Sequence, residues 1–285
     1  MQKIWVCGAR GQIGQAVNDV VDKLEFEMLD TDVDDLDVTD TDEVLRFGEM
    51  NRPDIIINCS GMTDISSCEK NPSQAFKVNA LGARNLAIVA AKMQAKMVQL
   101  STDDVFDGKS TEPYTEFDIT NPGTVYGKSK LAGENYVKEF TTKHFIVRST
   151  WVYGKGQNFI NGFLKKVDAG EQLSIASDQF GSPTSANELA RFLLHLVHTS
   201  EYGTYHATNK GVCSRYAFAQ EILKMTGKTA SMQPVPTVMS DFSKVRPAYA
   251  VLDNFIMSMV PIYDFPDWQD SLREYLEERG LYHAE

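Results

Sequence analysis

Short apolar runs alternate with stretches of helical periodicity through the first half of the chain. The apolar runs predict strands over residues 3–7, 26–29, 54–58, 96–100 and 144–148. Apolar residues at helical spacing predict helices over 15–24, 41–49, 71–93 and 126–140. The run at 54–58 is almost entirely apolar, as in a parallel strand that is covered on both faces. The alternation therefore predicts an α/β fold with a doubly wound parallel sheet of the Rossmann type.

The alternation of apolar runs and helical stretches becomes less regular after residue 154. There we expect helices over 158–167, 187–197, 214–225 and 268–279, with strands over 173–176 and 203–207. We interpret residues 1–150 as a dinucleotide-binding domain. Residues 151–285 then form a smaller C-terminal α/β lobe, with some segments returning to the first domain. A substrate cleft between the two lobes follows from this arrangement.

A glycine turn joins the first expected strand to the first expected helix. Gly8, Gly11 and Gly14 stand at the spacing Gly-x-x-Gly-x-x-Gly, which is looser than the standard dinucleotide fingerprint. Glycines at such a turn let the backbone approach a diphosphate, whose charge then lies at the helix N-terminus. The position of the motif predicts that the chain binds NAD or NADP.

Two residues give opposite indications about which dinucleotide is bound. Asp30 stands at the end of the second expected strand, where an acid typically holds the ribose 2′-hydroxyl of NAD. Arg10 lies in the glycine loop, where a guanidinium favours the 2′-phosphate of NADP. A solvated loop charge is the alternative for Arg10. Taken together, the two residues slightly favour NADP.

The candidate chemistry lies in the stretch 124–130. Tyr126 and Lys130 are four residues apart at the start of an expected helix, so both project from one helical face. A phenol titrates near ~10, and a neighbouring ammonium lowers that pKa by favouring the phenolate. Ser101 and Thr102 end the fourth expected strand and supply a hydroxyl for the same oxygen. Together these groups predict a proton-transfer site.

The composition of the chain disfavours several classes of ligand and location. The formal net charge of −11 disfavours nucleic acid and anionic membranes as ligands. No run approaches the ~18 apolar residues of a membrane span, and the first residues lead straight into a strand pattern. We therefore expect no signal peptide and a cytoplasmic location. The four cysteines show no metal-site spacing, so buried free thiols are expected and no metal site is assigned.

The order of these motifs resembles the extended short-chain dehydrogenase/reductase family. Further strings are similar to its dTDP-4-dehydrorhamnose reductase branch: Arg52-Pro53-Asp54-Ile55-Ile56-Ile57-Asn58, Val78-Asn79-Ala80, Ser101-Thr102-Asp103, Val105-Phe106-Asp107-Gly108, Tyr126-Gly127-Lys128-Ser129-Lys130, Arg148-Ser149-Thr150-Trp151-Val152-Tyr153-Gly154, Asp178-Gln179-Phe180-Gly181-Ser182-Pro183-Thr184 and Arg246-Pro247-Ala248. The similarity extends over nearly the whole chain.

The resemblance implies reduction of the C4 ketone of dTDP-6-deoxy-L-lyxo-4-hexulose to dTDP-L-rhamnose by NADPH or NADH. It assigns proton donation to Tyr126, ribose contact and phenol activation to Lys130, and a hydrogen bond to the reacting oxygen to Thr102. The implied cofactor contacts are Gly11, Gln12, Ile13, Asp37, Val38, Gly61, Met62 and Thr63. The implied sugar-nucleotide contacts are Thr102, Asp103 and Trp151, with Arg246 at the diphosphate. A core aromatic at a domain junction is the alternative for Trp151, and a structural ion pair for Arg246.

The sequence departs from the branch at two places. Asp104 replaces the usual tyrosine after Ser-Thr-Asp, and Ser60-Gly61-Met62 replaces Ala-Ala-Tyr or Ala-Ala-His. Thr102-Asp103-Asp104 is one methylene from the Thr-Asp-Glu of sugar-nucleotide dehydratases. We hypothesise that Asp104 contacts the substrate and alters which 4-keto sugar is accepted. The alternative is a surface loop with Asp104 in solvent.

Two other functions and the assembly stay open at this point. A sugar-nucleotide dehydratase or epimerase uses the same Tyr-Lys pair but regenerates its nicotinamide. A regulatory subunit of methionine adenosyltransferase shares the fold without catalysis, although Thr102, Tyr126 and Lys130 together disfavour it. We expect a monomer or a homodimer. Metal-bridged dimers are known in the branch, and Glu188 with the acidic C-terminal helix are candidate ligands, but solvated acids explain them as well.

Overall fold

The computed structural model describes residues 1–237 and 248–283 of the chain, and its larger lobe is built on a parallel sheet. Within those residues the sheet has the strand order β10-β5-β4-β3-β1-β2, and every neighbouring pair is parallel. The strands are β1 (Gln2–Cys7), β2 (Phe26–Thr31), β3 (Ile55–Asn58), β4 (Lys96–Thr102), β5 (His144–Ser149) and β10 (Gly203–His206). The predicted doubly wound parallel sheet is confirmed.

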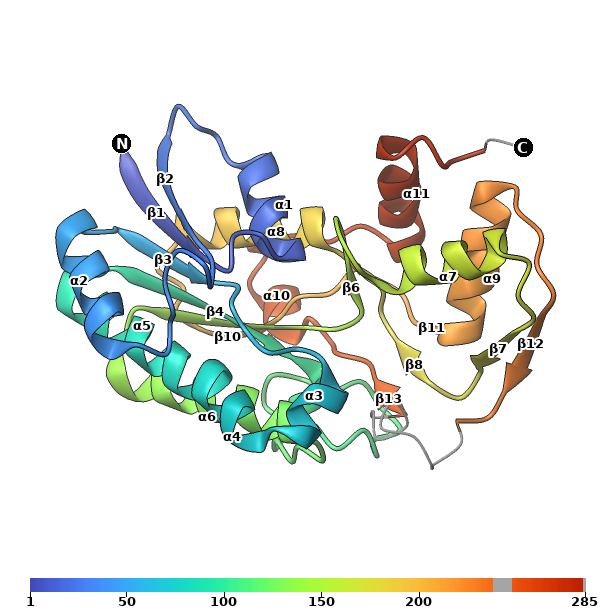
Figure 1. Cartoon of the computed structure of the whole chain (residues 1–285), viewed down its shortest axis with the longest axis horizontal. Coiled ribbons are helices and arrows are strands. Elements are labelled where there is room, and N and C mark those ends of the chain that lie inside the picture. The colour runs from blue at the N-terminus through green and yellow to red at the C-terminus, as the bar shows by residue number, and fades with distance from the viewer. Residues whose placement is uncertain (238–247, 284–285) are drawn as a thin grey trace.

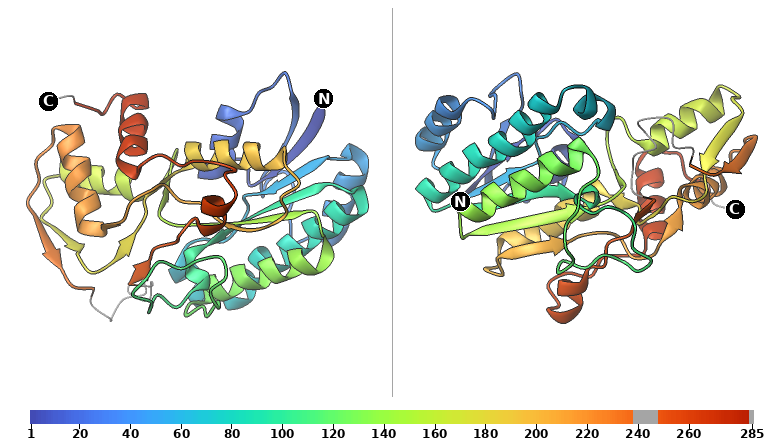
Figure 2. Two further views of the ribbon diagram at one scale, coloured as in Figure 1. Left: turned by 180° about the vertical axis from the view of Figure 1, so that it is seen from behind. Right: turned by 90° about the horizontal axis from the view of Figure 1, so that it is seen from below.

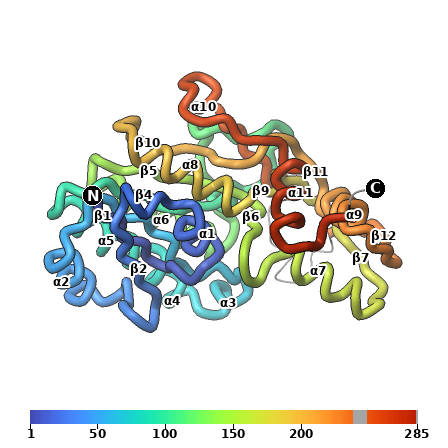
Figure 3. The backbone as a smooth tube through the Cα atoms, turned by 90° about the horizontal axis from the view of Figure 1, so that it is seen from above, coloured from blue at the N-terminus to red at the C-terminus, as the bar shows by residue number. Residues whose placement is uncertain are grey.

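Helices cover both faces of the sheet (Figures 1 and 2). One face carries α1 (Gln12–Val20) and α8 (Ala186–Val197), which lie side by side in the view from above (Figure 3). The other face carries α2 (Thr41–Asn51), α5 (Ala83–Met93) and α6 (Val125–Phe140), which the right-hand view in Figure 2, seen from below, shows most clearly. Between β3 and α5 the chain forms α3 (Ile65–Lys70), α4 (Pro72–Phe76) and the π-helical turn η1 (Lys77–Gly82).

The period of two along each strand divides the core into two layers. In β1, Ile4 and Val6 pack under α1 and α8, whereas Trp5 and Cys7 pack under the opposite helices. All four residues are fully buried, because helices lie on both sides. This is why the sequence shows continuous apolar runs rather than alternation.

The smaller lobe has its own core and lies at one end of the sheet (Figure 1). Its helices are α7 (Phe159–Asp168), α9 (Arg215–Thr226) and α11 (Trp268–Glu278), whereas α10 (Phe255–Met259) packs against β10 of the sheet lobe. Its strands are short: β6 (Val152–Tyr153), β7 (Leu173–Ala176), β8 (Phe180–Gly181), β9 (Thr184–Ser185), β11 (Cys213–Ser214), β12 (Met232–Val235) and β13 (Tyr249–Ala250). The predicted smaller C-terminal α/β lobe is therefore present.

Two elements from the second half of the chain belong to the sheet lobe. β10 pairs with β5 at the sheet edge, and α8 packs against α1. We therefore propose that the first domain comprises residues 1–150 together with 186–206, which gives the returning segments a definite place.

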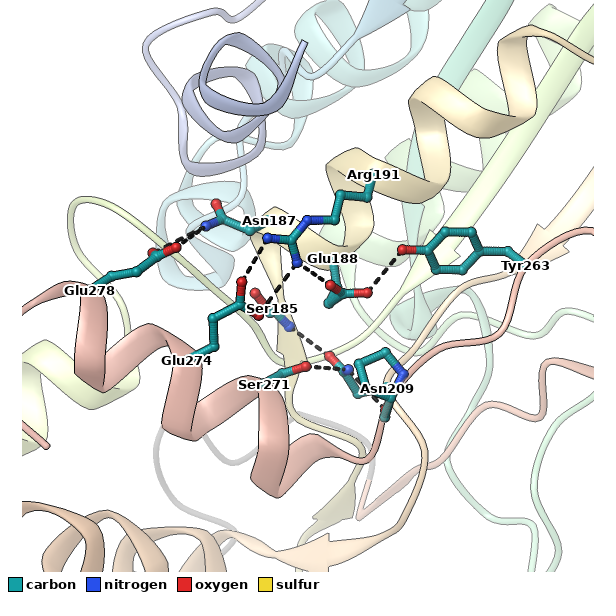
Figure 4. Close-up of polar contacts among 10 residues, drawn as sticks. Ser185, Asn187, Glu188, Arg191, Asn209, Tyr263, Ser271, Glu274 and Glu278 are labelled. Carbon is teal, nitrogen blue, oxygen red and sulfur yellow. Dashed lines mark hydrogen bonds and ion pairs between the residues drawn. The ribbon is translucent and has the colours of Figure 1, made fainter. Parts of the chain in front are cut away.

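A polar cluster joins α8 to α11 across the lobe junction (Figure 4). The Arg191 guanidinium lies between the carboxylates of Glu188 and Glu274, donating to Glu274 Oε1 over 2.7 Å and also to Glu188. Tyr263 Oη donates to the other oxygen of Glu188 over 2.9 Å. The cluster links α8 of the sheet lobe to the last helix of the smaller lobe.

Candidate active site

A cavity of about 670 Å³ opens at the carboxyl ends of the strands, between the two lobes. This edge is where open α/β sheets bind their ligands. The larger lobe contributes the glycine loop, the loop after β3, the end of β4 and the first turns of α6. The smaller lobe contributes Ser174, Gln179 and Arg215, among others. Trp151 and Val152 line it at the junction.

A second cavity, of about 530 Å³, adjoins the first and extends along the glycine loop towards the end of β2. The two share Gly11, Cys59, Ser60 and Gly61 as lining residues, so together they form one elongated site. An elongated site of this kind suits a dinucleotide, whose two nucleosides are joined by a diphosphate.

The glycine loop is shaped by close backbone approach. Gly8 has φ +76°, and a Cβ at this residue would lie 2.7 Å from Ser60 N. A Cβ at Gly14 would lie 2.4 Å from Gly8 O. Both positions therefore require glycine. Among the described residues no side chain caps α1 at Gly11, so the first N–H groups of that helix face the site and suit a diphosphate.

Most of the predicted cofactor residues are brought together along this elongated site. The second cavity is lined by Gly8, Arg10, Gly11, Asp37, Val38, Gly61 and Met62, and the first by Gln12, Ile13, Thr63, Tyr126 and Lys130. Gly14 shapes the turn beneath them. Asp30 is not brought to either cavity: it is exposed within β2, and Asp32 lines the second cavity instead. In the register of the sheet Asp30 lies opposite Val6, before the glycine loop begins, whereas Asp32 follows Thr31, the last residue of β2.

Helix α6 places Tyr126 and Lys130 in the first cavity. Thr124 begins the helix, since its side chain accepts a hydrogen bond from Gly127 N. A Cβ at Gly127 would lie 2.0 Å from Asp104 O, so the helix packs directly on the turn after β4. The close packing brings the tyrosine face of the helix to the end of β4. Thr102, Tyr126 and Lys130 are all buried and line the same cavity.

The turn after β4 is held by Thr102. Its Oγ1 accepts from Asp104 N over 3.2 Å and donates to Asp103 Oδ1 over 3.1 Å. Asp103 and Asp104 are both buried at the cavity wall, with Asp104 only 2% exposed. The alternative of a surface loop with Asp104 in solvent is therefore wrong.

Burial and a second charge determine the state of Lys130. Burial lowers the pKa of Lys130 to about 8, and the Glu134 carboxylate partly opposes that shift. Glu134 is fully buried one turn further along α6. It accepts from Arg148 Nε over 2.9 Å, from Arg148 Nη2 over 2.7 Å and from Ser101 Oγ over 2.6 Å.

Sequence reasoning missed the roles of Glu134 and Arg148. The only sequence signal was the spacing of four residues between Lys130 and Glu134, which is also common on exposed helices. Arg148 lies on β5, directly beside Ser101 of β4 in the register of the sheet. Their buried pairing therefore depends on the packing of α6 across both strands.

Asn79 is a third residue whose role sequence reasoning missed. It lies in the π-helical turn η1, where its Oδ1 accepts from Met62 N over 2.8 Å. Its Nδ2 donates to Met62 O and to Ser129 Oγ, each over 2.9 Å. A Cβ at Gly61 would lie 3.7 Å from Lys130 Nζ. Asn79 thus fixes the loop after β3 against α6, close to the lysine. A π-turn at a functional site is a recurring arrangement.

Comparison with known proteins agrees with this geometry. The family model described as the RmlD substrate binding domain matches residues 1–280. The chain belongs to this family. The spore coat polysaccharide biosynthesis protein SpsK of Bacillus subtilis is 35% identical over 98% of this chain and 99% of its own length.

Two solved structures are also similar over 98% of the chain and the whole of the other protein. A dTDP-4-dehydrorhamnose reductase from Clostridium acetobutylicum is 40% identical with a TM-score of 0.96. A dTDP-4-dehydrorhamnose reductase from Bacillus anthracis, solved in complex with NADP, is 36% identical with a TM-score of 0.95. Membership in this branch of the extended short-chain dehydrogenase/reductases, expected from the motifs, is confirmed.

In this member of the RmlD family, Trp151 forms the wall between the lobes. It has φ +48°, a strained backbone conformation for a tryptophan. Its ring lies between Gly181, where a Cβ would come within 2.6 Å of it, and the guanidinium of Arg215, 3.4 Å from a ring centroid. Arg215 and Gln179 line the cavity and were not predicted as site residues. Arg246, predicted at the diphosphate, lies outside the described residues.

The carboxylates considered as metal ligands have other partners in this chain. Glu188 accepts from Arg191 and Tyr263, and Glu274 is held by the same guanidinium (Figure 4). Over residues 1–237 and 248–283, three or more histidine, cysteine, aspartate or glutamate side chains nowhere gather in a way that could hold a metal ion.

Proposed function

We propose that this protein reduces the C4 ketone of dTDP-4-dehydro-L-rhamnose to dTDP-L-rhamnose with NADH or NADPH. One observation carries the proposal: the buried side chains of Thr102, Tyr126 and Lys130 line one cavity, and a second cavity adjoins it along the glycine loop. Family membership and the similarity to two solved dTDP-4-dehydrorhamnose reductases support it. The enzyme is thus an NAD(P)H-dependent oxidoreductase.

The site fits a nicotinamide dinucleotide. The uncapped start of α1 suits the diphosphate, and the cavity at the end of β2 suits the adenosine. Lys130 lines the first cavity beside Gly61, which both cavities share, and would hold the nicotinamide ribose. When bound, the reduced nicotinamide supplies the hydride that adds to C4 of the sugar.

The residues of the chain then handle the oxygen and the proton. Thr102 would donate a hydrogen bond to the C4 oxygen and so orient the ketone. As the oxygen gains negative charge, Tyr126 gives it a proton, which completes the alcohol. The Lys130 ammonium stabilises the phenolate that this transfer leaves behind. Glu134 keeps that ammonium charged in a buried setting, because its carboxylate favours the protonated amine.

The sugar nucleotide would occupy the part of the cavity between β4, Trp151 and the smaller lobe. The indole of Trp151, backed by Arg215, offers a flat face, and Gln179 offers an amide. Asp103 and Asp104 line the opposite wall. Because Asp104 is buried there, we propose that it influences which 4-keto sugar is accepted. Asp104→Tyr, compared over several dTDP-4-keto sugars, tests this: unchanged selectivity would contradict the role.

The decisive assay mixes the protein with dTDP-4-dehydro-L-rhamnose and NADH or NADPH. We expect loss of reduced cofactor in equal amount to product, with the L-rhamno configuration at C4 read by NMR. A dehydratase or epimerase would turn over substrate without net loss of cofactor. A regulatory subunit would show no turnover and would retain a methionine adenosyltransferase in a pull-down.

The assembly and the compartment stay predictions. We propose a monomer or homodimer, with a dTDP-sugar as ligand and no nucleic acid; light scattering at working concentration distinguishes the two states. Throughout the described part of the chain, every helix is too short or too polar to cross a bilayer.

A further inference from the structure

The turn after β2 wraps around the glycine loop at the far end of the dinucleotide cavity. Asp32 Oδ2 accepts from Arg10 N over 2.9 Å, and Asp32 Oδ1 accepts from Val33 N over 2.9 Å. Asp32 N in turn donates to Asp35 Oδ2 over 3.1 Å. The Asp32 carboxylate is therefore fixed at the end of β2, next to the glycine loop and on the cavity wall.

The guanidinium of Arg10 is held by the same turn. Its Nη1 donates to Asp34 Oδ2 over 2.7 Å, and its Nη2 donates to Asp35 Oδ2 over 2.8 Å. Hydrogen bonding to Asp34, helped by the charge of Asp35, raises the pKa of Arg10. The residue that favoured a 2′-phosphate in the sequence is thus paired with two carboxylates in the structure.

The local charge is negative even with Arg10 included. Arg10 is the one basic residue among the described residues that line this cavity, and Asp32 and Asp37 are its acidic lining residues. Asp34 and Asp35 complete the turn that holds Arg10. The charges of Asp32, Asp34 and Asp35 act on this one guanidinium, and Asp37 adds a fourth carboxylate to the cavity wall. A phosphate monoester carries about −1.5 to −2 charges at neutral pH, so it would enter a region that is already anionic.

We propose that the adenosine end of this site selects NADH over NADPH, with Asp32 accepting hydrogen bonds from the ribose hydroxyls and the Asp34–Asp35 pair withholding Arg10 from a 2′-phosphate. The proposal rests on the dinucleotide binding that the proposed function requires. It runs against the slight inclination towards NADP drawn from Arg10, and it sets this chain apart from the Bacillus anthracis relative solved with NADP.

The exposure of the ion pairs does not remove the selectivity. The Arg10 side chain is 58% exposed and that of Asp34 77%, so each pair is individually weak and screened. Arg10 can therefore swing away from its partners at small cost. A phosphate that drew it away would nevertheless meet Asp32, Asp34 and Asp35 without their counter-charge. The selectivity lies in the sum of charges, not in one pair.

The test is a binding measurement without sugar substrate. Dissociation constants of NADH and NADPH are determined by calorimetry on the full-length protein at low salt. We expect NADH to bind at least about tenfold more tightly, the scale of one or two charge contacts at an exposed rim. Equal affinities, or tighter NADPH, would overturn the proposal while leaving the reductase assignment intact. If neither dinucleotide binds, the proposed function itself fails.

Variants that remove one charge test whether charge determines the relative affinity for the two dinucleotides. Asp34→Asn releases one partner of Arg10 and keeps Asp35 in place; we expect NADPH affinity to rise about fivefold to tenfold, with NADH changed by less than about twofold. Arg10→Gln on that background should cancel most of the gain. Asp42→Asn removes the same charge from the exposed first turn of α2, outside the cavity, and serves as the matched control.

Two outcomes would count against the charge mechanism. One is an Asp42→Asn effect as large as that of Asp34→Asn, which would indicate a general charge effect. The other is an equal change in the affinities for both dinucleotides after Asp34→Asn. Thermal unfolding of each variant confirms that the comparison is between folded proteins.

Discussion

The two ends of the dinucleotide site use the same charged groups in opposite settings. At the catalytic end, Lys130, Glu134 and Arg148 are at most 5% exposed. At the adenosine end, the side chains of Arg10, Asp34 and Asp35 are 47–77% exposed. Both ends pair guanidinium groups with carboxylates at 2.7 to 2.9 Å. The geometry is similar, so burial alone accounts for the difference in what the pairs do.

Burial raises the free-energy cost of an unpaired charge, so a buried charge strongly affects its neighbours. In the low dielectric behind the catalytic end, one carboxylate changes the protonation of a lysine, and removal of a partner leaves an uncompensated charge. At the exposed rim, water and salt weaken each pair, and only the sum over several carboxylates acts on a ligand. The buried charges at the catalytic end determine the protonation of Lys130. The exposed charges at the adenosine end determine which dinucleotide binds.

The largest effect is expected for the phenol. Tyr126→Phe removes the proton donor, and we expect kcat to fall by about 10²–10⁴-fold with NADH binding retained. Tyr136→Phe, on the same helix but outside the cavity, is the control. Activity near that of the wild type in the Tyr126 variant would refute the catalytic assignment.

The next effect tests burial directly. Arg148→Met leaves the Glu134 carboxylate buried without its guanidinium, and we expect unfolding free energy to fall by about 3–5 kcal/mol in urea denaturation. The corresponding substitution at the exposed adenosine end, Arg10→Gln, should leave the urea midpoint nearly unchanged, because that pair is screened by water. Similar losses at both ends would contradict the contrast between them.

The pH dependence separates activity from stability at Lys130. Because the folded pKa is about 8, kcat/KM should fall as pH rises through 8 and the ammonium is lost. The unfolded chain keeps this proton up to the ordinary lysine value of 10.5, so it binds more protons between the two values. Unfolding free energy contributed by Lys130 therefore rises with pH from about 8 to 10.5. Lys130→Met should abolish that rise; its persistence would assign it to other groups.

A change in salt concentration should give the smallest effect, and it should affect the two ends of the site differently. Raising ionic strength from about 0.05 to 0.5 M shortens the screening length severalfold, so the preference for NADH over NADPH should shrink. The pH midpoint of kcat/KM should stay nearly constant, because Lys130 and Glu134 are buried. A midpoint that moved with salt as strongly as the cofactor preference would show that both ends are equally open to solvent.

Much of this molecule follows from local sequence pattern. The strands, the helices and the doubly wound order are encoded by apolar periodicity, and β7 begins and ends where the pattern places it. Gly14 follows from a turn whose own backbone, at Gly8 and Ala9, leaves no room for a side chain. Tyr126 and Lys130 share one face of α6 because they are four residues apart. These features depend on neighbours in the sequence, so the sequence alone determines them.

The tertiary structure decided the rest, because it depends on residues that are distant along the chain. Asp32 rather than Asp30 lines the cavity because Asp30 is still paired with Val6 inside the sheet. Arg148 meets Glu134 only because α6 crosses β4 and β5, and α8 and β10 join the first lobe only by packing. Periodicity carries no information on such contacts: a residue's charge is written in the sequence, but its burial and its partner are set when distant elements pack together.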